Sequence, residues 1–441
     1  MGELPIISPH GHVPPQWLAE DTSFEDPRRC SSPRTTTSTE CCTRTACPWP
    51  TWASAGRSSR RSGRATPSAS CARAGRPTAG RRSSSGSSPS SRTSSASTRP
   101  PSEDTADEIY DAIDAALQTP HFRPRALYER FDIEFIATTD DPCDDLRHHI
   151  SLANDPAWEG KVAPTFRPDK YLEPATPAWT GLVDTLGEVS GIDTGSYAGW
   201  VAAMEDRRAF FKSNGAVSTD HSHRDARVEP IPDAEAERLY SLARAGTITV
   251  DEGHMMRRTM VFQQARMASE DGLVMTMHPA VYRNHHAPTF EEYGADVGGD
   301  IPMGVEFVSA LQPRLSAFGT APDFQVVLFT IDETVYSREL APLAGFYPSV
   351  YVGAPWWFID SPEAMNRYRS AVTESAGFSR TSGFIDDTRA FLSIPARHDT
   401  NRRMDSGFLA RLVADHRLTM DEALDTAHDL VVTNPRKAFK L

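Results

Sequence analysis

Short apolar runs that end in polar or charged residues recur along this chain, with helical patterns between them. Runs of this kind are typical of strands that are buried on both faces of a parallel sheet. Eight of them, alternating with helices, predict an α/β fold of the (β/α)8 TIM-barrel type, with a long insertion between strands 1 and 2. The eight runs cover residues 4–8, 132–139, 162–166, 216–219, 273–278, 324–330, 350–353 and 383–385.

Cap signals mark several of the helices between these runs. Ser102 is the expected N-cap of one helix, and Ser361, followed by a proline, is the expected N-cap of another that should end at Gly377. Thr419 and Glu422 have the spacing of a capping box at the start of the last helical region.

The residues that follow the apolar runs are mostly polar, as the mouth of an enzymatic barrel requires. They are His10, His12, Asp140, Asp141, Arg167, Asp220, His221, His278, Asp332, Trp356, Trp357, Asp387 and Arg389. We therefore expect a site at the carboxyl ends of the strands.

A metal site is the first chemistry that this pattern indicates. His10 and His12 are two residues apart on an extended segment, so both imidazoles point the same way. Asp387 ends a distant strand and can complete the set, and His278 ends an interior strand. Two histidines and one carboxylate leave coordination positions open, as a catalytic metal requires, although isolated histidines near a terminus are often only solvated.

Arginines suggest an anionic substrate at the same place. Arg167 follows a strand. Arg389 and Arg397 both follow Asp387, after the last predicted strand. A guanidinium binds a carboxylate through two parallel hydrogen bonds, but a structural salt bridge is an open alternative for Arg167. Trp356 could form the wall of a sugar pocket or pack in the core.

One segment departs from the rest in composition and charge. Between residues 30 and 101 there are twelve arginines and one acid, so this segment carries +11 and the remainder -24 within a total of -13. It contains no Leu, Ile, Val, Met, Phe or Tyr. Such a segment cannot bury enough apolar surface to fold, so disorder is expected, either as a flexible linker or as a basic arm for nucleic acid.

A shifted reading frame is a third interpretation of this segment, and we favour it. Codons for residues 30–38 can be chosen so that the frame starting at the third base of the first codon encodes Leu-Val-Thr-Pro-Asp-His-Tyr-Val. In the same frame, residues 40–42 force Met or Val followed by Leu. We therefore divide the chain into 1–29, the first barrel strand and its loop; 30–101, the low-complexity basic segment; and 102–441, the remainder of the barrel.

Other features of the whole chain narrow the class of protein. The 441 residues suffice for one large barrel or two ordinary domains. No apolar run approaches the roughly 20 residues that span a bilayer, and the first residues lack a basic signal region, so we expect a cytoplasmic protein without membrane partners. Five of the six cysteines fall between residues 30 and 101, leaving only Cys143 elsewhere, so no disulfide framework is predicted.

Taken in order, the motifs resemble the uronate isomerase (glucuronate isomerase) family of the amidohydrolase superfamily. The resemblance covers residues 4–26 and the chain from residue 102 onward. The motifs are His-x-His, Thr-Thr-Asp-Asp-Pro, Phe-Arg-Pro-Asp-Lys, Asp-His after a strand, Met-x-Met-His, Trp-Trp-Phe-x-Asp, Asp-x-Arg-x-Phe and Pro-x-Arg-His.

The resemblance implies a metal-assisted isomerisation of D-glucuronate to D-fructuronate and of D-galacturonate to D-tagaturonate. It implies that His10, His12 and Asp387 hold a divalent metal, zinc being the first expectation, and that no organic cofactor takes part. Asp387, Arg389 and His278 are the implied catalytic residues. The resemblance places Arg167, Arg389 and Arg397 around the substrate, and Trp356 is a further substrate-binding candidate from its own motif.

The chain departs from the family in two places. The family carries Asp-His-Tyr shortly after its first strand, where this chain has residues 34–37, and aromatic residues after Arg-His, where this chain has residues 399–401. The shifted frame restores Asp-His-Tyr, so we expect the chain as written to have weak activity or none. The alternatives left open are a metal-dependent hydrolase of the same superfamily and a non-enzymatic protein that binds nucleic acid through the basic arm. A homo-oligomer is also left open.

Overall fold

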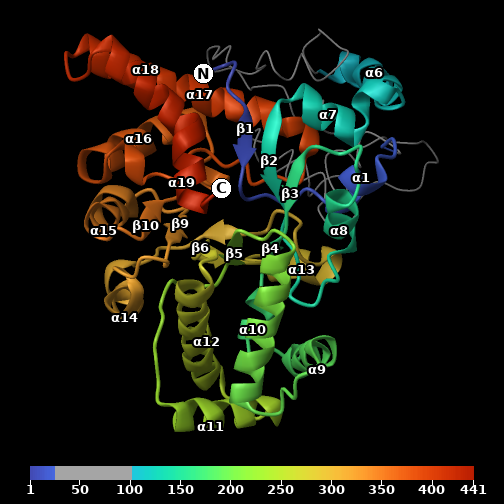
Figure 1. Ribbon diagram of the computed structural model, residues 1–441, viewed down its shortest axis with the longest axis vertical. Coiled ribbons are helices and arrows are strands. Elements are labelled where there is room, and N and C mark those ends of the chain that lie inside the picture. Colours follow the sequence, from blue (N-terminus) through green and yellow to red (C-terminus); the bar gives the residue numbers. More distant parts are fainter. Residues whose placement is uncertain (25–101) are drawn as a thin grey trace.

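A computed structural model of the chain describes residues 1–24 and 102–441. The predictions made for residues 30–101, including disorder and the shifted frame, therefore lie outside the described residues. Parallel strands occupy the middle of the molecule, and helices surround them (Figure 1). The fold is thus α/β with parallel sheets, as the apolar runs predict.

Two parallel sheets form the centre of the fold. The first contains, in spatial order, β1 (Ile6–Ser8), β2 (Ile133–Ala137) and β3 (Lys161–Ala163). The second contains, in spatial order, β10 (Val350–Val352), β9 (Val326–Leu328), β6 (Val274–Met277), β5 (Ser218–His221) and β4 (Thr165–Phe166). A separate antiparallel pair, β7 (Val281–Tyr282) and β8 (Ile301–Pro302), belongs to a loop beyond β6.

Seven of the eight predicted strand segments contain observed strands, but the segment at 383–385 does not. Thr381, two residues before that segment, forms a single parallel bridge with Val352 in β10. A second bridge, between Asp140 and Phe166, links the end of β2 to β4. The observed ladders therefore form two parallel sheets, linked to each other by the single bridge between Asp140 and Phe166.

Burial explains why these short runs form strands. Every residue of β5, β6, β9 and β10 is buried, including polar residues such as Ser218 and Thr276. A strand that is covered on both faces does not alternate between apolar and polar residues, which is why the runs read as continuous. The helices supply the covering layer.

The helices fall into two groups. Four of them form a lobe that extends away from the sheets (Figure 1): α9 (Trp179–Ser190), α10 (Tyr197–Ser213), α11 (Asp233–Arg244) and α12 (Val250–Asp271). The others are α1 (Pro15–Glu20), α6 (Ala106–Leu117), α7 (Pro124–Arg130), α8 (Arg147–Ala153), α13 (Ala287–Tyr293), α14 (Val308–Phe318), α15 (Ala341–Phe346), α16 (Pro362–Ala376), α17 (Ile394–Ala414), α18 (Met420–His428) and α19 (Asn434–Phe439). Short 3-10 turns cover Glu103–Thr105, Pro120–Phe122, Asp169–Leu172, Trp357–Ile359, Phe378–Arg380 and Phe391–Ser393, and π-helical turns cover Tyr336–Leu340 and Asp429–Thr433.

The predicted caps are confirmed. Ser102 precedes the 3-10 turn that leads into α6, and α16 ends at Gly377, whose φ of 69° suits a residue without a side chain. At α18, the Glu422 backbone N–H donates to Thr419 Oγ1 at 3.2 Å while the Thr419 N–H donates to the Glu422 carboxylate at 2.8 Å. Among the helices of the described ranges, none combines the length and apolar character needed to cross a bilayer.

Candidate active site

A cavity of about 400 Å³ opens at the carboxyl ends of the strands. Seven of the eight predicted site residues line it, whereas Arg397 does not. The seven are His10, His12, Arg167, His278, Trp356, Asp387 and Arg389. Because these residues are spread over 380 positions of the chain (10 to 389), the fold rather than local sequence brings them together.

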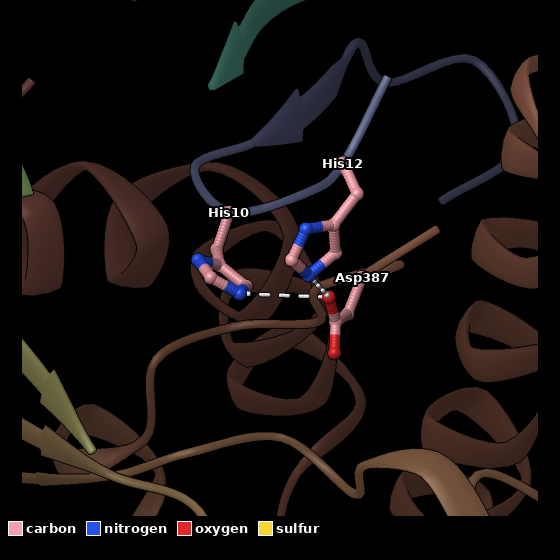
Figure 2. Close-up of side chains that lie close together, drawn as sticks. All are labelled: His10, His12 and Asp387. Carbon is pink, nitrogen blue, oxygen red and sulfur yellow. Dashed lines mark ion pairs between the residues drawn. The ribbon is translucent and has the colours of Figure 1, made fainter. Parts of the chain in front are cut away.

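His10, His12 and Asp387 meet at the floor of this cavity, where Figure 2 shows their side chains pointing toward one another. The distance to Asp387 Oδ1 is 3.0 Å from His12 Nε2 and 3.5 Å from His10 Nε2. The loop after β1 carries both histidines, and its His12 N–H donates to the Thr388 carbonyl oxygen at 3.0 Å. Asp387 itself has a φ of 40°, a left-handed conformation that aspartate tolerates better than most residues.

The protonation of His12 and Asp387 suits cation binding, whereas, in spite of burial, the carboxylates of Asp220 and Asp387 raise the pKa of His10. Burial lowers the pKa of His12 to about 4, in spite of the nearby Asp387 carboxylate. Burial opposes ionisation of Asp387, but the attraction of His12 and the close contacts with both histidine nitrogens outweigh it and hold the pKa of this carboxyl well below its usual value. A neutral imidazole beside an ionised carboxylate is the form in which these groups bind a metal.

His278 lies against the same group and has a fixed orientation. Its Nδ1 is 2.7 Å from Asp220 Oδ1, while its Nε2 is buried and has no hydrogen-bond partner among the described residues. The imidazole stacks on Phe329 at 4.2 Å and on His10 at 4.7 Å between ring centroids, and Trp356 meets it edge-on at 4.8 Å. Because the His278 Nδ1–H donates its hydrogen bond to Asp220, Nε2 is the ring nitrogen that can exchange a proton in the cavity.

Asp220 connects His278 to the first of the arginines. Its Oδ2 is 3.4 Å from Arg167 Nε, and its Oδ1 accepts a hydrogen bond from Thr276 Oγ1 at 3.0 Å. Burial opposes ionisation of Asp220, but His278 and Arg167 keep its pKa well below the usual value. The sequence placed Asp220 after a strand but gave it no role. Its position in the middle of the Thr219-Asp220-His221 run, at the end of a strand like His278, was the available signal.

The arginines behave differently from one another. Arg167 and Arg389 line the cavity, and Arg167 is held by Asp169 at 2.9 Å as well as by Asp220. Arg397 instead forms an ion pair with Asp360. The structure therefore does not bring Arg397 to the cavity, because a carboxylate 37 positions earlier in the chain holds its guanidinium.

Several cavity residues come from the loop that follows β6, which the sequence did not identify. Arg283 lies over the ring of Trp357, 5.0 Å from its centroid, and donates to Asp300 at 2.8 Å. Asn284 and Asp296 also line the cavity, next to Trp356 and Trp357. These polar groups, together with the two tryptophans, suit a hydroxylated ligand.

Comparisons with known proteins agree with this geometry. A family model described as glucuronate isomerase matches residues 98–439. The uronate isomerase of Cutibacterium acnes is 48% identical over 99% of this chain and 93% of the relative. The crystal structure of glucuronate isomerase from Caulobacter crescentus has a TM-score of 0.88 and 39% identity, covering 100% of this chain and 92% of that one. For the uronate isomerase structure from Thermotoga maritima the TM-score is 0.87 at 25% identity, with coverage of 100% and 95%.

Proposed function

Since the chain belongs to the uronate isomerase family, we propose that it interconverts D-glucuronate with D-fructuronate and D-galacturonate with D-tagaturonate. The observation that carries the proposal is the meeting of His10, His12 and Asp387 with two arginines and a buried histidine in one cavity. The relatives favour an isomerase over a hydrolase and over nucleic-acid binding.

The residues on the cavity floor fit a divalent metal ion, and we propose zinc. His10, His12 and Asp387 offer two imidazole nitrogens and one carboxylate oxygen within 4.8 Å of one another. Asp387 Oδ1 is buried and, among the described residues, has no hydrogen bond of good geometry despite its nearness to both histidines. When bound, the ion would supply positive charge that stabilises the oxygens of an enediolate.

The cavity residues can carry out the proton transfers of an aldose–ketose isomerisation. The reaction removes a proton from C2 of the open-chain sugar and places one on C1, while the hydroxyl proton moves from O2 to O1. We assign the carbon-to-carbon transfer to the Asp387 carboxylate, which is ionised. The neutral His278, with Nε2 facing the cavity, would transfer the proton between the two oxygens.

Arg167 and Arg389 would bind the uronate and orient it. Each lines the cavity, so their guanidiniums can bind the C6 carboxylate and a sugar oxygen through paired hydrogen bonds. Trp356 would form a wall of the pocket against the sugar ring. In this proposal Arg397 has no direct contact with substrate, since Asp360 holds it.

We propose that the two sheets are parts of one distorted (β/α)8 barrel. Support comes from the bridge between Asp140 and Phe166, which links the two sheets, and from the bridge between Val352 and Thr381, which extends the second sheet toward the last segment. The His12 to Thr388 hydrogen bond then joins the loop after β1 to the segment after residue 385. The proposed organisation is 1–29 as first strand and loop, 30–101 as a segment from a shifted frame, and 102–441 as the remainder. The family match begins at residue 98, close to the end of that segment.

The test is ketose formation from D-glucuronate and D-galacturonate, with and without added zinc. We expect turnover by a version whose coding sequence restores the frame across residues 30–101, and much less by the chain as written. A restored enzyme that binds zinc but forms no ketose from either uronate would refute the assignment. Resequencing the coding DNA tests the shifted frame separately, because a confirmed uninterrupted frame would rule it out.

A further inference from the structure

A second group of metal-ligand side chains lies beside the active-site cavity, formed by Asp169, His221 and His223. One ligand atom from each lies within 4.8 Å of the others. His221 ends β5, His223 follows two residues later, and Asp169 begins the 3-10 turn after β4. We propose that these three residues bind a divalent transition-metal ion of the zinc class, at a site separate from the one on the cavity floor.

The two imidazoles have the environment of metal ligands. His223 Nδ1 is 3.1 Å from a Glu173 carboxylate oxygen, and His221 Nε2 is 3.1 Å from Thr219 Oγ1. The remaining nitrogens, His223 Nε2 and His221 Nδ1, are buried and have no hydrogen-bond partner within the described part of the chain. When an oxygen that is not a metal ligand accepts a hydrogen bond from one ring N–H, the other ring nitrogen keeps a lone pair for the metal. This is the usual arrangement of histidines around a bound metal.

A charged His223 paired with Asp169 explains the geometry less well. The distance from His223 Nε2 to Asp169 Oδ1 is 3.6 Å, which is too long for a hydrogen bond. Asp169 already accepts hydrogen bonds from Arg167 Nε at 2.9 Å and from the Ser222 N–H at 3.0 Å. A proton on Nε2 would therefore be buried without an acceptor, which is unfavourable.

The surrounding charges also favour a cation. Two guanidiniums, those of Arg167 and Arg257, are shared among four carboxylates. These carboxylates belong to Asp169, Asp220, Glu173 and Asp225. Arg258 adds a third guanidinium, on Asp225. Negative charge thus still exceeds positive charge by one among these ion-paired arginines and carboxylates, so a bound cation would lower the cost of burying them.

The site has a side that faces solvent and a structural consequence. Asp169 lines a hollow of about 390 Å³ that His12, Arg167 and Arg389 also line, so solvent reaches the group on its Asp169 side. Two imidazole nitrogens and one carboxylate oxygen suit zinc better than calcium or magnesium, which prefer oxygen ligands. Bound there, the ion would join the turn after β4 to the end of β5 and fix Asp169, which positions Arg167.

Metal stoichiometry tests this inference. The full chain is stripped of metal, dialysed against Zn²⁺, and assayed for bound zinc by mass spectrometry. We expect two equivalents for the unaltered chain and one equivalent for His12→Asn, which disables the cavity-floor site. His223→Gln should also retain one, and the double variant none. The exposed His428 provides a matched control, and H428Q should retain two.

The His12→Asn chain makes the test independent of how well the His223 variant folds. If this chain binds no zinc and its melting temperature does not rise when zinc is added, the second site does not exist. Two equivalents in the His223→Gln chain would also overturn the proposal. Failure of the cavity-floor site is distinguishable, because it would appear as an absent equivalent in His223→Gln instead.

Discussion

The Asp220→Asn variant tests whether the Asp220 carboxylate determines the orientation and tautomer of His278 in the cavity. The Asp220 carboxylate holds His278 through a 2.7 Å contact at Nδ1 and thereby leaves Nε2 available in the cavity. An asparagine can accept from Nδ1 but brings no charge, and in its other orientation it donates and reverses the tautomer. A hydrogen bond to a charged group contributes about 1.5–3 kcal/mol, which corresponds to a loss of about 10- to 150-fold in kcat.

Steady-state ketose formation with saturating zinc, in the frame-restored chain, measures this loss. Thr276→Val is the matched control, because Thr276 Oγ1 donates to the same Asp220 oxygen without affecting its charge. We expect that control to lose no more than about fivefold, from roughly 1 kcal/mol. If Asp220→Asn stays within threefold of the unaltered enzyme, or if both variants lose the same amount, His278 does not depend on Asp220 and its assigned role is wrong.

Three further changes have outcomes that follow from the structure. Arg389→Lys should raise KM for D-glucuronate at least tenfold with a smaller effect on kcat, because an ammonium cannot form the paired hydrogen bonds of a guanidinium. Arg369→Met should lower the free energy of unfolding in urea by about 3–5 kcal/mol, since it leaves the buried Asp405 carboxylate without its bidentate partner. Asp140→Asn should remove a pH dependence of the free energy of unfolding. Burial raises the pKa of Asp140 to about 7, so above about pH 4 the folded chain keeps a proton that the unfolded chain releases. The stability of the unaltered chain should therefore fall by up to about 4 kcal/mol as pH rises from about 4 to about 7.

The two arginine changes have a control in the same chain. Arg403 forms an exposed pair with Asp399, so Arg403→Lys should leave KM unaltered and Arg403→Met should cost less than about 1 kcal/mol. For Asp140, both short contacts, from Thr138 Oγ1 and the Thr165 N–H, go to one oxygen that asparagine also has. Equal pH dependence in the unaltered and Asp140→Asn chains would contradict the buried, protonated carboxyl, and unchanged KM in Arg389→Lys would remove Arg389 from the substrate site.

The sequence predicted strands better than it predicted how they join. Continuous apolar runs located seven strand segments, because burial on both faces leaves a strong signal in each run. The eighth run failed at 383–385, where the chain turns instead of pairing. Gly383 has a φ of 74°, and a Cβ at that position would lie 2.6 Å from Pro435 Cδ. The sequence Gly383-Phe384-Ile385 resembles a short buried strand, but in the structure Gly383 is the position of a bend.

The positions of site residues could be predicted where the end of a strand alone determines them. They could not be predicted where a hydrogen-bond or ion-pair partner determines where the side chain lies. His10, His12 and Asp387 meet as expected because the loop after β1 and the segment after residue 385 lie side by side. Arg397 has the same residue type as Arg389, which lines the cavity, yet Asp360 holds the Arg397 guanidinium elsewhere. Sequence spacing does not show which carboxylate a guanidinium finds. The same limit hid the role of Asp220, which exists only through its contact with His278.

The residues of the cavity-floor metal site come from near the two ends of the chain. Metal binding can therefore be independent of the intervening residues that turnover needs. Contacts that bypass residues 25–101 hold the amino-terminal segment in place: β1 pairs with β2, and Arg402 donates to the carbonyl oxygens of Met1 and Pro5 at 3.2 and 2.7 Å. The entropy of closing a connection rises only slowly with its length, so altered residues between β1 and β2 need not prevent this pairing. We therefore expect the chain as written and the frame-restored chain to bind equal amounts of zinc, while only the restored chain forms ketose efficiently. Zinc binding that appears only after frame restoration would show that the intervening residues are needed to assemble the ligands themselves.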